Sequence, residues 1–193
     1  MEQPIVPVIY GSVRRERQGI RAARYAMHQL ERRGVRAVLV DPLEQQLPLL
    51  DRMYKEYPAG TAPAPLEELA SLYRSADGFI VVSGEYNHGA PPALVNLLDY
   101  FLEEYFWRPA AIVSYSSGRF GGVRAAYALR SMLAEMGMVT IPSQLPIPAV
   151  QKAFDENGVP VDPKTDEWTA RFFDEFIWYM NALRPARRAG VPY

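Results

Sequence analysis

Three short segments of the chain carry the side chains with the most distinctive chemistry. Residues 11–19 read GSVRRERQG and combine one hydroxyl group with three arginines. Residues 84–92 read GEYNHGAPP, and residues 116–122 read SSGRFGG. Each segment follows a run of apolar residues, as a loop at the end of a buried strand does. The sequence therefore indicates three loops rich in glycine, amide and hydroxyl groups.

The first loop has the chemistry of a phosphate site. Backbone N–H groups at a helix N-terminus lack intrahelical partners, and the helix dipole adds positive potential. Ser12 supplies a hydroxyl donor, and Arg14 or Arg17 supplies a guanidinium group that binds phosphate oxygens in a bidentate way. Arginines at this end of a helix oppose its dipole, so a plain solvated loop is the less favoured alternative. We therefore predict an anion site here.

Neither of the better-known phosphate motifs is present. No Gly-Lys-Ser or Gly-Lys-Thr occurs, which argues against a P-loop NTPase. Gly11 and Gly19 lie too far apart for a G-x-G-x-x-G dinucleotide loop. Asp41 ends the second expected strand, but it lies about thirty residues after the loop, whereas a ribose-binding acid is expected after about twenty.

The elements that must position these loops alternate between short apolar strands and amphipathic helices. The expected strands are 5–10, 35–40, 78–83, 110–115 and 138–141, with a continuation of the last to Leu145 left open. The expected helices are 19–33, 66–75, 91–103, 122–136 and 166–183. Residues 41–65 are rich in proline without a clear period, which predicts a long excursion.

This alternation predicts a single α/β domain over residues 1–193, with a doubly wound, five-stranded parallel sheet in three αβα layers. The preferred strand order is 2-1-3-4-5, the flavodoxin-like arrangement. Ligands of such sheets bind beyond the carboxyl ends of the strands, where the strand order reverses. That rule selects the loops after the first, third and fourth strands.

Composition excludes several classes of function. The formal net charge is −1, so no overall basic field would attract nucleic acid or an anionic membrane. The absence of cysteine excludes disulfides, iron–sulfur clusters and a cysteine nucleophile. With only two histidines, a transition-metal centre is not expected. The N-terminus lacks the pattern of a signal peptide and no apolar run is long enough to span a bilayer, so a cytoplasmic location is expected.

The segments GSVRRERQG, GEYNHGAPPALVNLLDY and SYSSGRFGG together resemble the NADPH-dependent FMN reductase family of flavodoxin-like proteins. That family carries a GSxR-type phosphate loop, a PEYN segment followed by a proline and an LKNAIDW-like helix start, and an SxGxxGG-type loop. The resemblance covers residues 4–142, in the family's order and with similar spacing.

The resemblance implies that the chain binds FMN through these loops. The implied phosphate contacts are Ser12, Arg14 and Arg17, with backbone contacts from Gln18, Gly19 and Ile20. The implied contacts along the isoalloxazine ring are Gly84, Glu85, Tyr86 and Asn87. The implied contacts on the other side of the site are Ser116, Ser117 and Gly118. Asn96 and Asp99 match residues that we expect to be structural or to contact another subunit.

The chain departs from the family pattern at four of these positions. Gly84 replaces the usual proline, and Gly89 stands where serine is common. Arg17 and Gln18 lie where many relatives have serine and another small polar residue. Outside the family context, Tyr86 would be a packed or surface tyrosine and Asn87 a turn residue that tolerates a left-handed backbone.

The resemblance implies an oxidoreductase that passes a hydride from NADPH or NADH via FMN to a small acceptor, such as a quinone, an azo compound, a flavin or a metal oxyanion. We assign no catalytic side chain, and a proton-donating role of His88 is left open. A flavodoxin-type electron carrier is the alternative, less favoured because such carriers are strongly acidic and use a phosphate loop rich in serine and threonine. A nucleotide-binding or regulatory module on the same sheet is a further alternative.

Residues 93–102 are apolar on nearly all sides, so a helix there needs cover on more than one face. Internal packing could supply that cover. The resembled family commonly forms dimers or tetramers through this region, which implies a homodimer or homotetramer. The basic residues 184–188 are expected to form a solvated terminus.

Overall fold

A computed structural model describes residues 3–193 of the chain. Its sheet has five parallel strands in the order β2-β1-β3-β4-β5, which confirms the predicted order. The strands are β1 (Ile5–Tyr10), β2 (Arg36–Val40), β3 (Phe79–Gly84), β4 (Pro109–Tyr115) and β5 (Val139–Ile147). Because all pairs are parallel, every strand ends at the same edge of the sheet.

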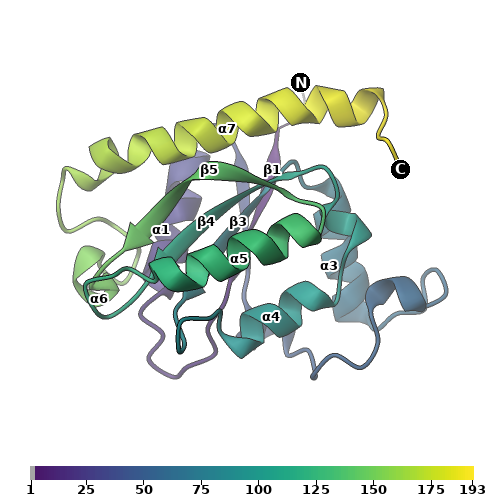
Figure 1. Cartoon of the computed structure of the whole chain (residues 1–193), viewed down its shortest axis with the longest axis horizontal. Coiled ribbons are helices and arrows are strands. Elements are labelled where there is room, and N and C mark those ends of the chain that lie inside the picture. Colours follow the sequence, from purple (N-terminus) through teal and green to yellow (C-terminus); the bar gives the residue numbers. More distant parts are fainter. Residues whose placement is uncertain (1–2) are drawn as a thin grey trace.

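Helices cover both faces of the sheet and make the three predicted layers (Figure 1). The longer helices are α1 (Ile20–Glu31), α3 (Ala64–Ser75), α4 (Pro92–Asp99), α5 (Val123–Glu135) and α7 (Thr165–Ala189). Two short helices are α2 (Pro42–Gln45) and α6 (Val150–Ala153). Within residues 3–193, no helix is both long enough and apolar enough to cross a bilayer.

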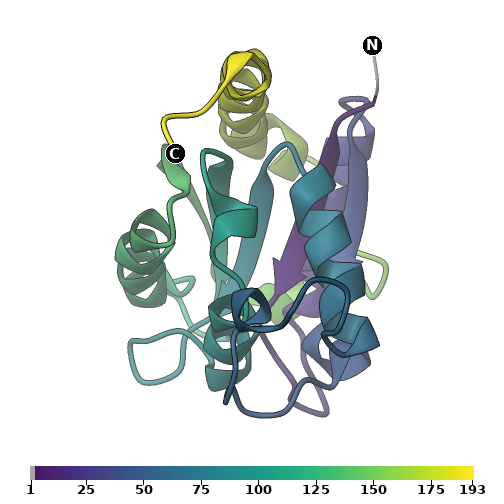
Figure 2. The same ribbon diagram turned by 90° about the vertical axis from the view of Figure 1, so that its right-hand side faces the viewer.

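The excursion predicted for residues 41–65 is shorter in the structure, because α2 occupies Pro42–Gln45 and α3 begins at Ala64, which leaves residues 46–63 between them. Figure 2 shows this segment, in dark blue, crossing the lower part of the molecule beside α4. The Asn96 amide of α4 holds it in place, because Nδ2 donates to the Pro48 carbonyl at 2.7 Å and Oδ1 accepts from the Leu50 amide at 2.8 Å. Asn96 is therefore structural, one of the two roles expected for it.

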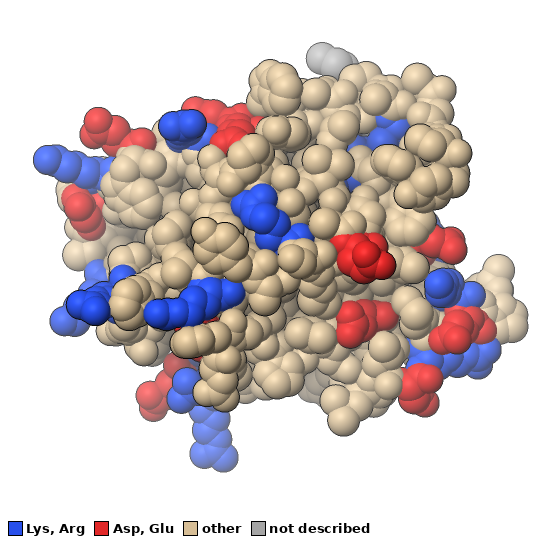
Figure 3. Space-filling view, in the orientation of Figure 1, with Lys and Arg blue, Asp and Glu red and all other residues tan. Residues whose placement is uncertain are grey.

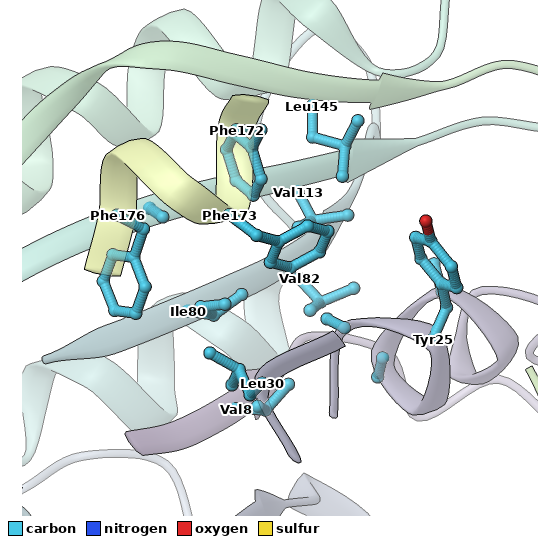
Figure 4. Packing of buried hydrophobic residues seen from close by; sticks show 14 of the residues in the cluster. Val8, Tyr25, Leu30, Ile80, Val82, Val113, Leu145, Phe172, Phe173 and Phe176 are labelled. Carbon is cyan, nitrogen blue, oxygen red and sulfur yellow. The ribbon is translucent and has the colours of Figure 1, made fainter. Parts of the chain in front are cut away.

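The strand side chains alternate between two apolar layers. On one face, Val8, Ile80 and Val113 pack against α1 and α7, and Figure 4 shows Phe172, Phe173 and Phe176 of α7 directed onto them. On the other face, residues such as Ile9, Val81 and Ile112 pack against α3, α4 and α5. The surface in Figure 3 carries acidic and basic side chains interspersed among uncharged ones. A sheet buried on both faces leaves its carboxyl edge as the place where polar loops gather.

Internal packing covers much of the apolar α4 region. Leu94, Leu97 and Leu98 are buried, and so are Tyr100 and Phe101 just beyond the helix. The helix stops at Asp99 rather than near residue 103, and a 3-10 turn follows at Glu103–Tyr105. The apolar pattern therefore does not by itself require a second subunit.

The ends of β5 and α7 also differ from the sequence-based expectation, for a tertiary reason. β5 continues to Ile147 because its second half pairs with Ile112–Tyr115 of β4 after a register shift. α7 continues past Leu183, through Pro185, to Ala189. Arg184 and Arg187 of this last part both lie 3.1 Å from the buried Asp77 carboxylate. The prediction of a solvated basic terminus was therefore wrong for these two arginines.

Asp166 joins α7 to α1 and provides a test of how α7 is held. Its carboxylate accepts from the Tyr25 hydroxyl, the Gln29 amide and the Arg32 guanidinium at 3.1, 2.7 and 2.5 Å. Burial acts to raise the pKa of Asp166, but the hydrogen bonds outweigh it and leave the pKa below its ordinary value of 3.8.

We predict that Asp166→Asn lowers the free energy of unfolding by about 1 kcal/mol at pH 7. The amount is modest because the ion pair between Asp166 and Arg32 is partly exposed. A carboxyl group whose pKa is lowered by folding stabilises the protein above the unfolded pKa and loses that effect as the pH falls through the folded pKa. The gap between wild type and variant in urea unfolding should therefore shrink from pH 7 to about pH 3. An equal gap at both pH values would contradict this account.

Candidate functional site

A cavity of about 270 Å³ lies at the carboxyl edge of the sheet, where the loops after β1, β3 and β4 gather at the lower left of Figure 1. Ten of the thirteen predicted site residues line it: Ser12, Arg14, Arg17, Gln18, Gly19, Gly84, Glu85, Tyr86, Ser116 and Ser117. Three predicted residues, Ile20, Asn87 and Gly118, do not line it. The cavity also contains four residues that the sequence did not single out as part of the site: Glu16, Tyr115, Val150 and Gln151.

The loop after β1 leaves hydrogen-bond donors near the start of α1. Among the residues that the structure describes, the amides of Val13, Arg17 and Gly19 have no protein acceptor. The amides of Gln18 and Ile20 differ, because they donate to the Glu16 and Arg17 carbonyls at 3.0 and 3.2 Å. The helix dipole of α1 adds positive potential at this position. The loop therefore provides free amide donors at Gly19 rather than at its two neighbours.

Ser12 and Arg14 of this loop both line the cavity, and they differ in burial. Ser12 is 3% exposed, and its hydroxyl lies 3.4 Å from the Tyr86 hydroxyl on the loop after β3. Arg14 is exposed, and its backbone amide donates to the Ser12 hydroxyl at 3.4 Å. The Arg14 guanidinium group makes no ion pair with any acid in residues 3–193, so its charge is available to an anion in the cavity.

Arg17 is held by a buried carboxylate. Its guanidinium group lies 2.5 Å from Asp41, whose side chain is 2% exposed at the end of β2. Asp41 also accepts from the Leu43 amide at 3.0 Å and so caps α2. The hydrogen bond to Asp41 raises the pKa of Arg17 and fixes its position. Arg17 thus links the loop after β1 to β2, and much of its charge is neutralised there.

The loop after β3 makes a tight turn beside the cavity. The Tyr86 and Gly89 backbones exchange two hydrogen bonds of 2.9 Å, and Asn87 and His88 between them have φ values of 51° and 69°. Two residues with positive φ in such a bridge form a type I′ turn, which asparagine favours at its first position. The turn places Asn87 and His88 outside the cavity, while Tyr86 remains in its wall.

Glu85 connects this loop to the next. One of its carboxylate oxygens accepts from the backbone amides of Arg124 and Ala125 at 3.0 and 3.3 Å. These amides open α5, whose N-cap residue, Gly122, has no side chain to cap them. The Arg124 guanidinium group lies 3.6 Å from the other oxygen. Glu85 therefore fixes the distance between the second and third loops of the site.

Tyr115, the last residue of β4, explains two glycines of the cavity. A Cβ atom on Gly19 would lie 1.9 Å from the Tyr115 ring, and one on Gly84 would lie 3.1 Å from it. Only glycine fits at position 19, and Gly84 is tightly approached in the same way. Gly84, where the family usually has proline, thus leaves room for the bulky Tyr115 ring, which lies between the first and second loops.

The phenols under the loop after β1 remain neutral donors. The Tyr115 hydroxyl donates to the Tyr10 hydroxyl at 3.3 Å, and the two rings stack with centroids 6.3 Å apart. Burial raises the pKa of both Tyr10 and Tyr115 above the ordinary value of 10.0. Because neutral phenols both donate and accept hydrogen bonds, they give the cavity floor polarity without negative charge.

The last wall comes from α6, far along the chain. Val150 and Gln151 line the cavity, and the Gln151 amide donates to the Ser117 carbonyl at 3.2 Å. On the other side of the loop after β4, the Ser116 hydroxyl donates to the Gly118 carbonyl at 3.0 Å and accepts from the Gly121 amide at 2.9 Å. Ligands of parallel sheets bind beyond the carboxyl ends of the strands, and applying this rule to β5 as well would have predicted that α6 belongs to the site.

The arrangement suits an anionic ligand with a flat, polar-edged part. The cavity lining combines arginine side chains and free amides with glycine backbone, hydroxyl groups and the rings of Tyr86 and Tyr115. Between residues 3 and 193, no three acidic or histidine side chains are grouped so as to hold a metal ion.

Comparisons with known proteins agree with this arrangement. Residues 5–152 match the family described as NADPH-dependent FMN reductase. An NAD(P)H-dependent FMN reductase of Pseudomonas aeruginosa is 33% identical over 139 residues, which cover 68% of this chain and 75% of that enzyme. A quinone reductase of Escherichia coli is 33% identical over 124 residues, which cover 60% of this chain and 66% of that enzyme, just under two thirds of its length.

Solved structures support the fold. FerB, a flavoenzyme NAD(P)H:(acceptor) oxidoreductase from Paracoccus denitrificans, superimposes with a TM-score of 0.75 at 22% identity. The superposition covers 93% of this chain and 98% of that one.

The contact between Gly19 and Tyr115 predicts a strong coupling between their substitutions. Gly19 has helical φ and ψ of −65° and −15°, so alanine is acceptable to the backbone and only the ring opposes it. Gly19→Ala should cost about 1–3 kcal/mol of stability by overpacking. In a Tyr115→Ala background the same change should be neutral or stabilising. Urea unfolding of the four proteins measures the coupling, and additive effects would contradict the packing described.

The cap made by Glu85 predicts a loss of stability. Glu85→Ala should lower the free energy of unfolding by about 1 kcal/mol, because two amides at the start of α5 lose their acceptor. Glu85→Gln retains an acceptor oxygen and should lose less. Glu68→Ala, at an exposed position of α3, is the matched control and should stay within about 0.5 kcal/mol of wild type. Equal losses for Glu85→Ala and Glu68→Ala in urea unfolding would exclude the cap.

Proposed function

The chain belongs to the NADPH-dependent FMN reductase family, and we propose that it binds FMN in its cavity. With this cofactor the protein passes reducing equivalents from NAD(P)H to a small acceptor. The observation that carries the proposal is that the loop after β1, with its arginines and free amides, lines the same cavity as the loops after β3 and β4, which are rich in glycine and hydroxyl groups. That cavity lies between β1 and β3, where the strand order reverses.

The donors in the loop after β1 fit the phosphate of FMN. Ser12, the Gly19 amide and the Arg14 guanidinium group surround the start of α1, which favours negative charge. Arg17 acts as a positioning residue rather than as a free phosphate ligand, since Asp41 already holds its guanidinium group. This assignment narrows the phosphate contacts that the family resemblance implied.

The loops after β3 and β4 supply the residues that fit the flavin ring. Gly84, Tyr86 and Ser117 line the cavity, and the absence of a side chain at Gly84 leaves room for the Tyr115 ring beside it. When bound, FMN accepts a hydride from NAD(P)H and returns electrons to an acceptor. The side chains orient it: Glu85 sets the spacing of the loops after β3 and β4, and the Tyr115 ring packs between the loops after β1 and β3.

The acceptor, the assembly and the location belong to the same proposal. A quinone is the preferred acceptor, since a relative is named a quinone reductase; azo compounds, flavins and metal oxyanions are the other candidates. A homodimer or homotetramer is the assembly that the family resemblance implies. We place this single-domain enzyme in the cytoplasm, in line with its lack of cysteine.

A spectrum tests the proposed function. After incubation with FMN and desalting, the protein should retain flavin absorbance, and NADPH or NADH should bleach it under anaerobic conditions. Retained bands that neither nucleotide bleaches would favour the electron carrier. Loss of all flavin on desalting, with no change of flavin fluorescence on titration, would refute the cofactor site.

An arginine variant of the same protein tests which end of the cavity binds phosphate. Arg14→Ala should weaken FMN binding about tenfold, the effect of losing one charge-assisted phosphate contact, and leave riboflavin binding unchanged. Riboflavin is the matched control because it lacks only the phosphate. Equal weakening of both ligands would show that Arg14 does not contact the phosphate.

A further inference from the structure

A second cavity, of about 500 Å³, lies at the amino edge of the sheet, and its volume suits a small molecule. It borders the residue that precedes β4 and the last turns of α7. Figure 1 places the end of α7 at the upper right, whereas the loops of the first cavity lie at the lower left. Three aromatic rings and two guanidinium groups line the second cavity: Phe106, Trp107, Tyr193, Arg108 and Arg187. The proposed function makes no use of them.

Three consecutive residues before β4 border this cavity, although neighbours along an extended strand point to opposite faces. The backbone makes this possible at Trp107, whose φ of 62° lies in the left-handed region. That conformation is uncommon for a bulky side chain and has to be held by its surroundings. The Trp107 amide donates to the Gly137 carbonyl at 3.0 Å, and a Cβ atom on Gly137 would lie 2.5 Å from the Phe106 ring. The turn before β5 therefore holds this wall of the cavity in place.

The aromatic side of the cavity combines an open ring with an unpaired donor. The Tyr193 ring centroid lies 4.9 Å from that of Trp107 and 5.8 Å from that of Phe106. Tyr193 is nevertheless 78% exposed, so most of its surface is free to contact a ligand. The Trp107 Nε1 atom is buried, and no group in the described part of the chain accepts its hydrogen bond. A buried donor without an acceptor is costly, and beside a cavity it points to a polar ligand.

The two guanidinium groups of the lining have donors to spare. Arg108 forms no ion pair with any acid in residues 3–193, and it donates to three backbone carbonyls. These bonds use three of its five N–H groups. Arg187 shares the Asp77 carboxylate with Arg184, each at 3.1 Å, so a single carboxylate serves two guanidinium groups. The positive charge beside the cavity is therefore only partly neutralised.

The surroundings of these two cations favour an added anion. Burial and the nearby Arg187 charge lower the pKa of Arg108 to about 10. Burial also lowers the pKa of Arg187, against the attraction of Asp77. A lowered pKa of a cation means that its surroundings disfavour positive charge, and a negative charge placed there offsets this. Glu103 also lines the cavity, but it is exposed, so water weakens its effect on an anion.

We propose that this cavity is a second ligand site of the protein and binds a small aromatic acid. The ring of the acid contacts Phe106, Trp107 and Tyr193. Its carboxylate accepts hydrogen bonds from the remaining N–H groups of Arg108 and Arg187, since a guanidinium fork matches the planar carboxylate. The site lies apart from the FMN cavity and does not depend on the proposed function.

Tryptophan fluorescence tests the site directly. Substituting Trp168→Phe and Trp178→Phe, at residues that are 51% and 65% exposed, leaves Trp107 as the only tryptophan of the chain. The probes are benzoate and benzamide, its uncharged counterpart of similar shape, added to the protein with and without FMN. Both probes should change the Trp107 emission in a saturable way. Benzoate should bind about tenfold more tightly, the effect of one charge-assisted contact.

Further substitutions in this background separate the charge from the rings. Arg108→Gln and Arg187→Gln should each remove the preference for benzoate. Tyr193→Ala should weaken the binding of both probes, and Glu103→Gln should tighten benzoate about threefold without affecting benzamide. Because Tyr193 and Glu103 are exposed, these two variants test the site even where an arginine variant fails to fold. Arg171→Gln, at an exposed position of α7, is the matched control and should behave as the background protein.

Several outcomes would overturn the proposal. Equal affinity for benzoate and benzamide would do so, as would an unchanged Trp107 emission with either probe. A preference for benzoate that survives in both Arg108→Gln and Arg187→Gln would contradict the assigned contacts. Benzoate affinity that falls when FMN is added would assign the probe to the first cavity.

The second site and the proposed function fail separately. Loss of all flavin on desalting, with the preference for benzoate intact, would refute the cofactor site and leave the second site standing. Flavin bands that NADPH bleaches, with no preference between the two probes, would refute the second site and leave the function standing.

Discussion

Parallel pairing of five strands brings every carboxyl end to one edge of the sheet, and helices bury both faces. Polar loops therefore cannot cross the faces of β1, β3 or β4 and must gather at that edge. Reversal of the strand order between β1 and β3 separates the first helices that follow them and leaves room for a ligand. The cavity lies where this topology allows it, and the loop sequences supply its chemistry.

Three contacts hold the loops of the cavity relative to one another without help from a ligand. Asp41 ties Arg17 of the first loop to β2, and Glu85 ties the second loop to the start of α5. The Tyr115 ring packs between the first two loops against their glycines. Each contact joins segments that are distant in sequence. A site prepared in this way spends less free energy on ordering when it binds a cofactor.

Carboxylate contacts neutralise some of the arginines and leave others without an acidic partner. Asp41 neutralises much of the Arg17 charge, and Asp77 does the same for the basic end of α7. Arg14 and Arg119 remain without an acidic partner in the described residues, and Arg14 lines the cavity. With a net charge of only −1, the chain attracts anions through this local placement rather than through an overall field.

The sequence by itself predicted the strands and the three loops, because apolar periodicity and glycine-rich strand ends are local signals. The strand order came from the usual arrangement of such sheets, and the family resemblance supplied ten residues that line the cavity. Only the tertiary structure brought in Tyr115, whose apolar surroundings resemble any strand end, and Gln151, which lies on a short helix far along the chain. It also decided that Arg17 faces Asp41 and that α7 continues through Pro185 to place Arg187 on Asp77. Side-chain partners depend on contacts between distant segments, and local patterns do not encode which segments meet.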